Sequence, residues 1–235
     1  INHITVPEVM QVLVQDENCK IDAFLGPSHV SVISGSKIYE KFPRDYNKPV
    51  VVSGFEPVDV MQSISMIVKQ FKEKRANLEI EYKRVVSYEG NLKAQELINK
   101  YFKKVPFKFR GIGEVENSGY ELKDEFDKYN AKIVYKDILP TQEVKENKAC
   151  KCPEILKGIA KPTDCKIFGT VCTPTNPIGY CMARSEGECS AYYKYGNLLY
   201  RDSRDLEQIK QRIQKYSDAR NWDEFHNPKN LVMAL

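Results

Sequence analysis

The chain has 235 residues, a formal net charge of +4 and 42% hydrophobic residues. This length allows one large domain or two modest ones, each with a buried core. The small, evenly interleaved charge excludes the basic stripe of a nucleic-acid-binding protein, and no apolar run reaches the roughly 18 residues that cross a bilayer. Because no signal peptide opens the sequence, we expect a cytoplasmic protein that contacts neither nucleic acid nor membrane.

Short apolar runs alternate with helical patterns over residues 1–140. The first two runs, residues 23–25 and 50–52, each lead into a turn and predict buried strands. Pro57 suits the first position of a helix, and apolar side chains then recur at helical spacing. These side chains are Val60, Met61, Ile64, Ile67, Val68 and Phe71. Residues 78–86 alternate like a strand, and residues 92–102 have helical spacing.

This alternation predicts an α/β fold over residues 1–145, with a parallel or mixed sheet and flanking helices. Functional side chains of such sheets gather on the loops after the carboxyl ends of the strands. His29 and Glu56 each follow such an end and are the candidate catalytic residues, because an imidazole and a carboxylate can move protons or orient a bound metal fragment. A structural histidine is the alternative for His29, and a carboxylate at a helix start is the alternative for Glu56.

Two further polar residues are weaker candidates in this part of the chain. Arg84 lies near the end of its predicted strand, and Asn91 follows Gly90. The alternatives are an exposed arginine and an asparagine that caps a helix.

Residues 146–197 form a second predicted module, in which regular structure is scarce. It holds six of the seven cysteines, namely Cys150, Cys152, Cys165, Cys172, Cys181 and Cys189. The paired cysteines of structural zinc sites and the tight cysteine run of ferredoxins are both missing. A disulfide framework is typical of small secreted domains. Spacing alone therefore leaves three alternatives open. They are an iron–sulfur cluster or other metal site, a zinc site, and disulfides or unligated thiols.

Several motifs together resemble the HypD family of hydrogenase maturation proteins. The first part of the chain contributes Phe24-Leu-Gly-Pro-Ser-His-Val, Val52-Ser-Gly-Phe-Glu-Pro-Val-Asp and Arg84-Val-Val-Ser-Tyr-Glu-Gly-Asn. The cysteine region contributes Cys150-Lys-Cys-Pro-Glu-Ile-Leu-Lys-Gly, Pro162-Thr-Asp-Cys-Lys-Ile-Phe-Gly-Thr-Val-Cys and Gly179-Tyr-Cys-Met-Ala-Arg-Ser-Glu-Gly-Glu-Cys. The resemblance is to the carboxyl-terminal part of the family and extends over residues 1–196.

The resemblance implies a 4Fe-4S cluster bound by four cysteines, Cys152, Cys165, Cys172 and Cys189. Cys150 would replace Cys152 as a ligand or act as a nearby redox thiol. Of the other two cysteines, Cys181 is expected to be a packed thiol and Cys19 to be inert.

The resemblance also implies a role as scaffold and electron donor in building the Fe(CN)2CO centre of nickel–iron hydrogenases. The implied partners are a HypC-like chaperone and a HypE-like dehydratase, so we expect a redox maturation factor rather than a conventional turnover enzyme. Two family motifs, a Cys-Gly motif and Gly-Pro-Gly-Cys-Pro-Val-Cys, do not occur in this sequence. The sequence also begins at Ile1 rather than Met and stops at Leu235 inside an apolar run. We therefore expect a fragment that cannot complete the reaction.

Residues 198–235 predict a helical tail. From about residue 204 the sequence resembles the start of a MazG-like nucleotide pyrophosphohydrolase, through Arg220-Asn-Trp-Asp-Glu-Phe-His-Asn-Pro. The alternative function is thus a pyrophosphohydrolase fusion whose catalytic carboxylates lie beyond the fragment. The six cysteines are present and the acidic hydrolase motif is not, which favours the assembly factor.

Overall fold

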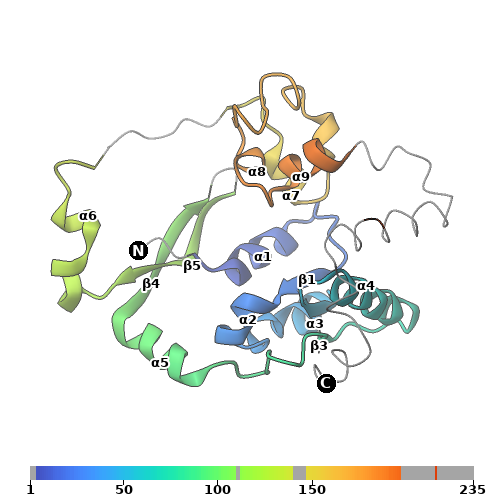
Figure 1. Cartoon of the computed structure of the whole chain (residues 1–235), viewed down its shortest axis with the longest axis horizontal. Helices are drawn as coiled ribbons and strands as arrows, with labels where there is room; N and C mark the ends of the chain where they lie inside the picture. The colour runs from blue at the N-terminus through green and yellow to red at the C-terminus, as the bar shows by residue number, and fades with distance from the viewer. Residues whose placement is uncertain (1–3, 110–111, 140–146, 197–214, 216–235) are drawn as a thin grey trace. The chain divides into compact units, whose positions relative to one another are not determined.

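A computed structural model of the chain describes residues 4–109, 112–139, 147–196 and 215. The chain separates into two compact units, residues 1–166 and 167–235 (Figure 1). The predicted domain boundaries after residues 145 and 197 stay predictions. The predicted tail lies outside the described residues except for Lys215.

The first unit is built on a three-stranded parallel sheet. Its strands are β1 (Phe24–Pro27), β2 (Val50–Ser53) and β3 (Leu78–Ile80), and they lie in the order β1-β2-β3. Phe24 is level with Val50, and Val50 is level with Leu78. The predicted α/β fold with a parallel sheet and flanking helices is therefore confirmed.

Helices connect the strands, and the sequence predicts the one that begins at Pro57. β1 leads through α2 (Ser28–Ser34), a 3-10 helix η1 (Lys37–Tyr39) and α3 (Lys41–Tyr46) to β2. Pro57 opens α4 (Pro57–Lys72), which packs against β2 and leads to β3. Each connection returns the chain to the same end of the sheet, so the three strands are parallel.

The core of this unit lies on one face of β2. Tyr39, Phe42, Val50 and Val52 are almost inaccessible to solvent and pack with Met10. Met10 comes from α1 (Val6–Gln15), which also packs against a separate hairpin. Val51 points to the opposite face of the sheet and is equally buried. Burial of β2 on both faces explains its unbroken run of valines.

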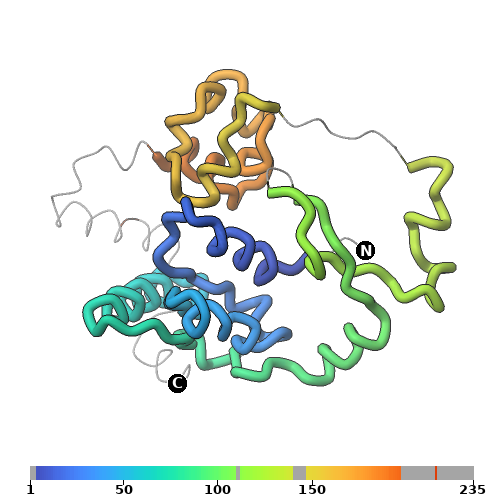
Figure 2. Tube along the Cα trace, turned by 180° about the vertical axis from the view of Figure 1, so that it is seen from behind, coloured from blue at the N-terminus to red at the C-terminus, as the bar shows by residue number. Residues whose placement is uncertain are grey.

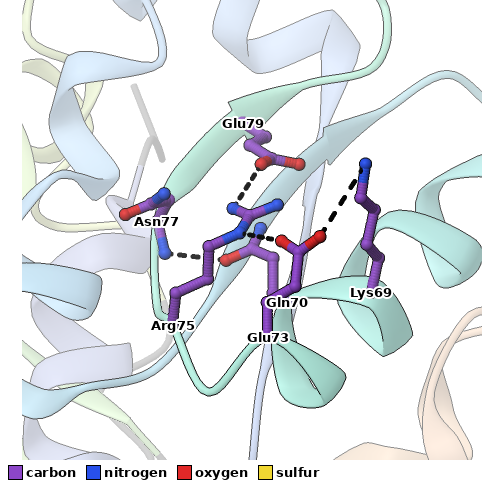
Figure 3. A network of polar contacts seen from close by, with 6 residues as sticks. All are labelled: Lys69, Gln70, Glu73, Arg75, Asn77 and Glu79. Carbon is purple, nitrogen blue, oxygen red and sulfur yellow. Dashed lines mark hydrogen bonds and ion pairs between the residues drawn. The ribbon is translucent and has the colours of Figure 1, made fainter.

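A network of polar contacts fixes the turn between α4 and β3 (Figure 3). The Gln70 side chain is fully buried, and its Oε1 accepts the backbone N–H of Asn77 at 2.7 Å. Arg75 donates to Glu73 Oε2 at 2.5 Å and to Glu79 Oε1 at 2.6 Å. These contacts join the last turn of the helix to the first residues of the strand.

The predicted strand over residues 78–86 is wrong beyond Ile80. The backbone amides of Glu81 and Tyr82 both donate to the carbonyl of Val52, at 2.9 and 3.3 Å. Two consecutive amides that share one acceptor cannot continue a ladder, since successive strand residues point in opposite directions. The chain therefore leaves the sheet and turns across its carboxyl end.

A two-stranded antiparallel hairpin follows the parallel sheet in this unit. It consists of β4 (Phe102–Phe109) and β5 (Gly113–Leu122), and it follows the predicted helix, α5 (Leu92–Tyr101). The pairing shifts register between Val105 and Phe107, where Pro106 lacks the N–H of a regular ladder. Figure 2 shows α1 beside this hairpin, and Thr5 N donates to Ser118 O at 2.8 Å.

The rest of the described chain holds only short helices. They are η2 (Asp124–Tyr129), α6 (Ala131–Val134), α7 (Cys152–Leu156) and η3 (Pro162–Asp164) in the first unit, and α8 (Tyr180–Ala183) and α9 (Glu188–Tyr195) in the second. The described helices include none that is both long and apolar enough to cross a membrane.

Candidate functional site

The predicted pair of catalytic residues lies at the carboxyl end of the parallel sheet. His29 is in the first turn of α2, directly after β1, and Glu56 is the residue before α4, directly after β2. The His29 imidazole lies against the Phe55 ring, with centroids 5.2 Å apart, and both rings are exposed. An exposed imidazole beside an aromatic ring is held in place yet remains accessible to a ligand.

Glu56 occupies the N-cap position of α4 in an extended backbone conformation. Its side chain makes no capping hydrogen bond to the helix. The carboxylate is exposed, and its negative charge acts on Arg84 and Glu81 nearby. The structure therefore places the Glu56 carboxylate at the helix start, as the alternative interpretation holds, with no side-chain hydrogen bond to the helix.

Sequence reasoning missed two carboxylates at this end of the sheet, Asp59 and Glu81. Asp59 is only 5% exposed, and Arg84 Nη2 donates to its two oxygens at 3.0 and 2.9 Å. The Arg84 guanidinium also lies 4.5 Å from the centroid of the Tyr82 ring. Arg84 is thus the partner of a buried carboxylate. The signal in the sequence was the position of Asp59 in the first turn of a helix, where a carboxylate is favoured.

Glu81 lies beside this ion pair and interacts with the loop after β2. Its Oε2 accepts the backbone N–H of Gly54 at 3.3 Å. Burial raises the pKa of the Glu81 carboxyl, and the negative charges of Asp59 and Glu56 add to this effect. The carboxyl end of the sheet therefore combines three carboxylates, one guanidinium and one imidazole.

Gly90 and Asn91 have structural roles. Gly35 and Gly90 both have positive φ, and a Cβ on Gly90 would lie 2.2 Å from the Gly35 nitrogen. The two loops can approach this closely only without side chains. Asn91 Oδ1 accepts the Ala94 N–H at 3.0 Å and caps α5. The alternative interpretation of Asn91 as a helix cap is confirmed.

Three cysteines of the cysteine region belong to the first unit. The Sγ atoms of Cys150 and Cys152 are 3.1 Å apart, which is a contact between thiols because a disulfide bond measures about 2.05 Å. Cys165 Sγ lies 3.7 Å from the carbonyl oxygen of Ala149. Burial, the Cys152 hydrogen bond and the nearby Cys165 raise the pKa of the Cys150 thiol to about 12. A bound cation would reverse this effect by favouring the thiolate.

The segment with these three cysteines is attached to the beginning of the chain. Lys157, just after α7, forms an ion pair with Asp16 at 2.5 Å, and its carbonyl accepts the Lys20 N–H at 2.9 Å. The side-chain hydrogen bond from Lys157 lowers the pKa of the Asp16 carboxyl. These contacts hold α7 beside the loop that follows α1.

The other three cysteines lie in the second unit, and each is buried. Cys172 Sγ accepts the backbone N–H of Ile178 at 3.4 Å. Cys181 is in α8, and Cys189 is in the first turn of α9. The Phe168 ring packs edge-on against Tyr192 and Tyr193, with centroids 6.1 Å apart in each case. Aromatic packing thus supports the loops that hold these thiols.

The donor chemistry of the cysteine region fits an iron–sulfur cluster or another thiophilic metal. Five of its six thiols are at most 7% exposed, and an N–H that points at a thiol sulfur is a common feature of cluster ligands. Among the residues that the structure describes, no three His, Cys, Asp or Glu side chains converge in metal-binding geometry. The structure therefore brings Cys150 and Cys152 together without selecting four ligands.

A family model described as HypD, hydrogenase formation hypA family, matches residues 1–196 of this chain. The match includes the strand-end loops and all six clustered cysteines. The chain belongs to the HypD family.

Curated relatives in this family come from bacteria and an archaeon. The hydrogenase maturation factor HypD of Cupriavidus necator is 44% identical over 201 residues, which cover 83% of this chain and 52% of that protein. HypD2 of Bradyrhizobium diazoefficiens is 44% identical over 202 residues, with 83% and 53% covered. A putative hydrogenase expression/formation protein of Methanocaldococcus jannaschii is 44% identical over 193 residues, with 82% and 53% covered.

This chain spans about half the length of these HypD relatives. The family match ends at residue 196, before the segment that resembles a MazG-like hydrolase. That resemblance, from about residue 204 onward, lies outside the described residues except for Lys215 and stays a prediction.

Proposed function

We propose that this chain is the carboxyl-terminal part of a cytoplasmic hydrogenase maturation factor that carries a 4Fe-4S cluster. The family match over residues 1–196 carries the proposal, because it joins the cysteine region and the strand-end loops in one family. The proposed role is that of scaffold and electron donor in the assembly of the Fe(CN)2CO centre. The proposed partners are a HypC-like chaperone and a HypE-like dehydratase.

The proposed cluster ligands are Cys152, Cys165, Cys172 and Cys189, with Cys150 as a replacement for Cys152 or as a redox thiol. Burial of the first four of these thiols supports the assignment, because a cluster is stable where water and oxygen have little access. A 4Fe-4S cluster supplies one electron at a time, at a potential tuned by hydrogen bonds to its sulfurs and by burial. The N–H of Ile178 at Cys172 is one such hydrogen bond.

The proposed contact with the iron fragment, which is the substrate, is at the carboxyl end of the sheet. His29 is exposed and supported by Phe55, so its ring N–H is able to donate a hydrogen bond to a cyanide nitrogen. Glu56 is exposed on the neighbouring loop and is able to accept a proton from a bound ligand. The Asp59–Arg84 ion pair positions the start of the helix that follows Glu56.

Metal analysis of anaerobically reconstituted protein tests the cluster. We expect about four iron and about four sulfide per chain, with the brown absorption of a 4Fe-4S cluster. Cys165→Ala and Cys172→Ala should each abolish the absorption, whereas Cys181→Ala and the control Cys19→Ala should keep it. Stoichiometric zinc in place of iron would contradict the proposal, and equal loss in Cys181→Ala would show that a different set of four cysteines binds the cluster.

A further inference from the structure

A cavity of about 600 Å³ lies in the first unit, between the start of α1, the α2 helix and the residues that join α5 to β4. Its walls are mainly apolar and include Val6, Val30, Ile33, Ile38, Ile98 and Phe102. Val30 and Ile33 are 43% and 37% exposed, so α2 presents apolar surface here that the fold does not cover. Small-molecule sites have volumes of about 300–1,000 Å³ and mostly apolar walls with a few polar groups. The cavity matches this description.

The cavity is separate from the sites described above. His29, Glu56 and the six clustered cysteines are not among the described residues that line it. Its polar part consists of three charged side chains, Glu8, Lys41 and Lys104. They come from α1, the first residue of α3, and β4. The cavity therefore combines apolar walls with a small group of charges.

Lys41 differs from Lys104 in its partners. Lys104 Nζ donates to Glu8 Oε1 at 2.8 Å, so the charges of these two side chains compensate each other. Lys41 Nζ donates to the neutral Gln11 Oε1 at 2.6 Å. Because an ammonium group has three N–H donors, this bond leaves two of them for water or a ligand.

The carboxylates near Lys41 are already paired with other cations. Glu8 and Asp45 both act on the Lys41 charge, but Glu8 binds Lys104 and Asp45 binds Arg44 at 2.7 Å. In the part of the chain that the structure describes, Lys41 forms no ion pair of its own. Burial lowers the pKa of the Lys41 ammonium, as expected for a cation partly removed from water. An anionic group in the cavity would supply the missing partner.

The charge balance and the walls together select the class of ligand. Lys41, Lys104 and Glu8 have a combined charge of +1, which one carboxylate neutralises, whereas a phosphate monoester has a charge of about −1.5 to −2 at pH 7. The apolar walls favour an aliphatic chain, because removal of apolar surface from water is favourable in proportion to its area. An organic cation would be repelled by Lys41.

We propose that this cavity binds an aliphatic carboxylate, such as a medium-chain fatty acid. The carboxylate accepts hydrogen bonds from Lys41 Nζ, and the chain covers the exposed surfaces of Val30 and Ile33. Both residues belong to α2, which also carries His29. A ligand in the cavity therefore contacts the helix that holds this imidazole.

Isothermal titration calorimetry of the full chain under reducing conditions, with decanoate as the probe, tests the proposal. Decanol and decylammonium have the same chain and differ in the head group. We expect one decanoate per chain, with a negative heat-capacity change from burial of the alkyl chain. Decylammonium should bind at least about tenfold more weakly than decanoate, because it loses a charged hydrogen bond and is repelled by Lys41.

Three variants separate the head group from the chain. Lys41→Met keeps an apolar stem without the charge, so its affinity for decanoate should fall about tenfold or more while its affinity for decanol is unchanged. Lys37→Met is the matched control, because Lys37 pairs with Glu89 and does not line the cavity. Val30→Trp places a larger side chain in the cavity and should weaken both ligands. Circular dichroism verifies that each variant is folded.

Several outcomes would overturn the proposal. One is the absence of saturable decanoate binding to the wild type. Another is decylammonium that binds as tightly as decanoate, which would exclude a role for the carboxylate. A third is Lys37→Met that weakens decanoate as much as Lys41→Met does. An equal loss of decanol and decanoate affinity in Lys41→Met would show that Lys41 only supports the fold.

Discussion

Gly54 shows how a single residue controls the carboxyl end of the sheet. A Cβ at this position would lie 2.1 Å from Asp59 Oδ2 and 2.6 Å from Tyr82 Cδ2. Asp59 cannot move away without leaving Arg84, so Gly54→Ala should lower the free energy of unfolding by about 2 kcal/mol. Urea unfolding followed by circular dichroism measures this loss. Gly26→Ala is the control with a smaller effect, because its nearest contacts are side chains at 3.3 Å or more.

Glu81 predicts a pH dependence at the same place. Burial raises its folded-state pKa above the ordinary value of 4.5, with Asp59 and Glu56 adding to the effect. A carboxyl with a raised folded-state pKa contributes stability that is present below its unfolded pKa and is lost as pH rises through its folded pKa. Glu81→Gln keeps an acceptor for the Gly54 N–H and cannot ionise. We therefore expect the urea midpoint of Glu81→Gln to rise relative to that of the wild type between about pH 4 and about pH 7. An unchanged difference between the two midpoints would contradict the assignment.

At the scale of elements, the cap of α5 offers a direct test. Asn91 Oδ1 accepts the Ala94 N–H, and the Asn91 N–H donates to Ile33 O. Asn91→Ala removes only the first of these bonds and should cost about 1 kcal/mol of unfolding free energy. Asn91→Asp keeps a capping oxygen and should lose much less. Equal losses in the two variants would show that the cap contributes little.

Most elements around the sheet could be predicted from the sequence, because local patterns determine them. Three local patterns correctly predicted β1, β2 and α4. They are the apolar run before Gly26-Pro27, the valines of β2 and the proline that starts α4. The β4–β5 hairpin was not predicted, since Pro106 interrupts its alternation and shifts its register. The predicted length of β3 was wrong, because the strand ends where the next two backbone amides both bind the Val52 carbonyl of β2.

The candidate site was predictable only where it follows strand ends. His29 and Glu56 lie where the sequence placed them. Asp59 and Glu81 were missed because their proximity depends on how α4 packs against the sheet. The exposure of Met61, Ile64 and Val68 on α4 was hidden for the same reason, because helical spacing identifies an apolar face and does not say which way it points. Spacing likewise cannot select four ligands from six cysteines that belong to two units.

At the scale of the whole molecule, this chain is about half as long as its HypD relatives. The family motifs that the sequence lacks lead us to expect that the chain alone does not restore hydrogenase activity in cells without HypD. The full-length HypD of Cupriavidus necator, expressed at the same level, is the positive control. Restoration of hydrogenase activity by this chain alone would show that those motifs are dispensable.

The contact between Asp16 and Lys157 has a consequence for the order of events during synthesis. These residues are 141 positions apart, whereas the three strands follow one another in the sheet as they do along the chain. Short-range pairings form first, and translation adds roughly 5–20 residues per second, so Lys157 leaves the ribosome roughly 4–15 s after Ile80. The loop that receives α7 is therefore made and folded before the first clustered cysteine exists. Iron delivered during translation would meet a finished docking surface and none of the six clustered thiols, so insertion of the proposed cluster has to follow the synthesis of residues 150–189.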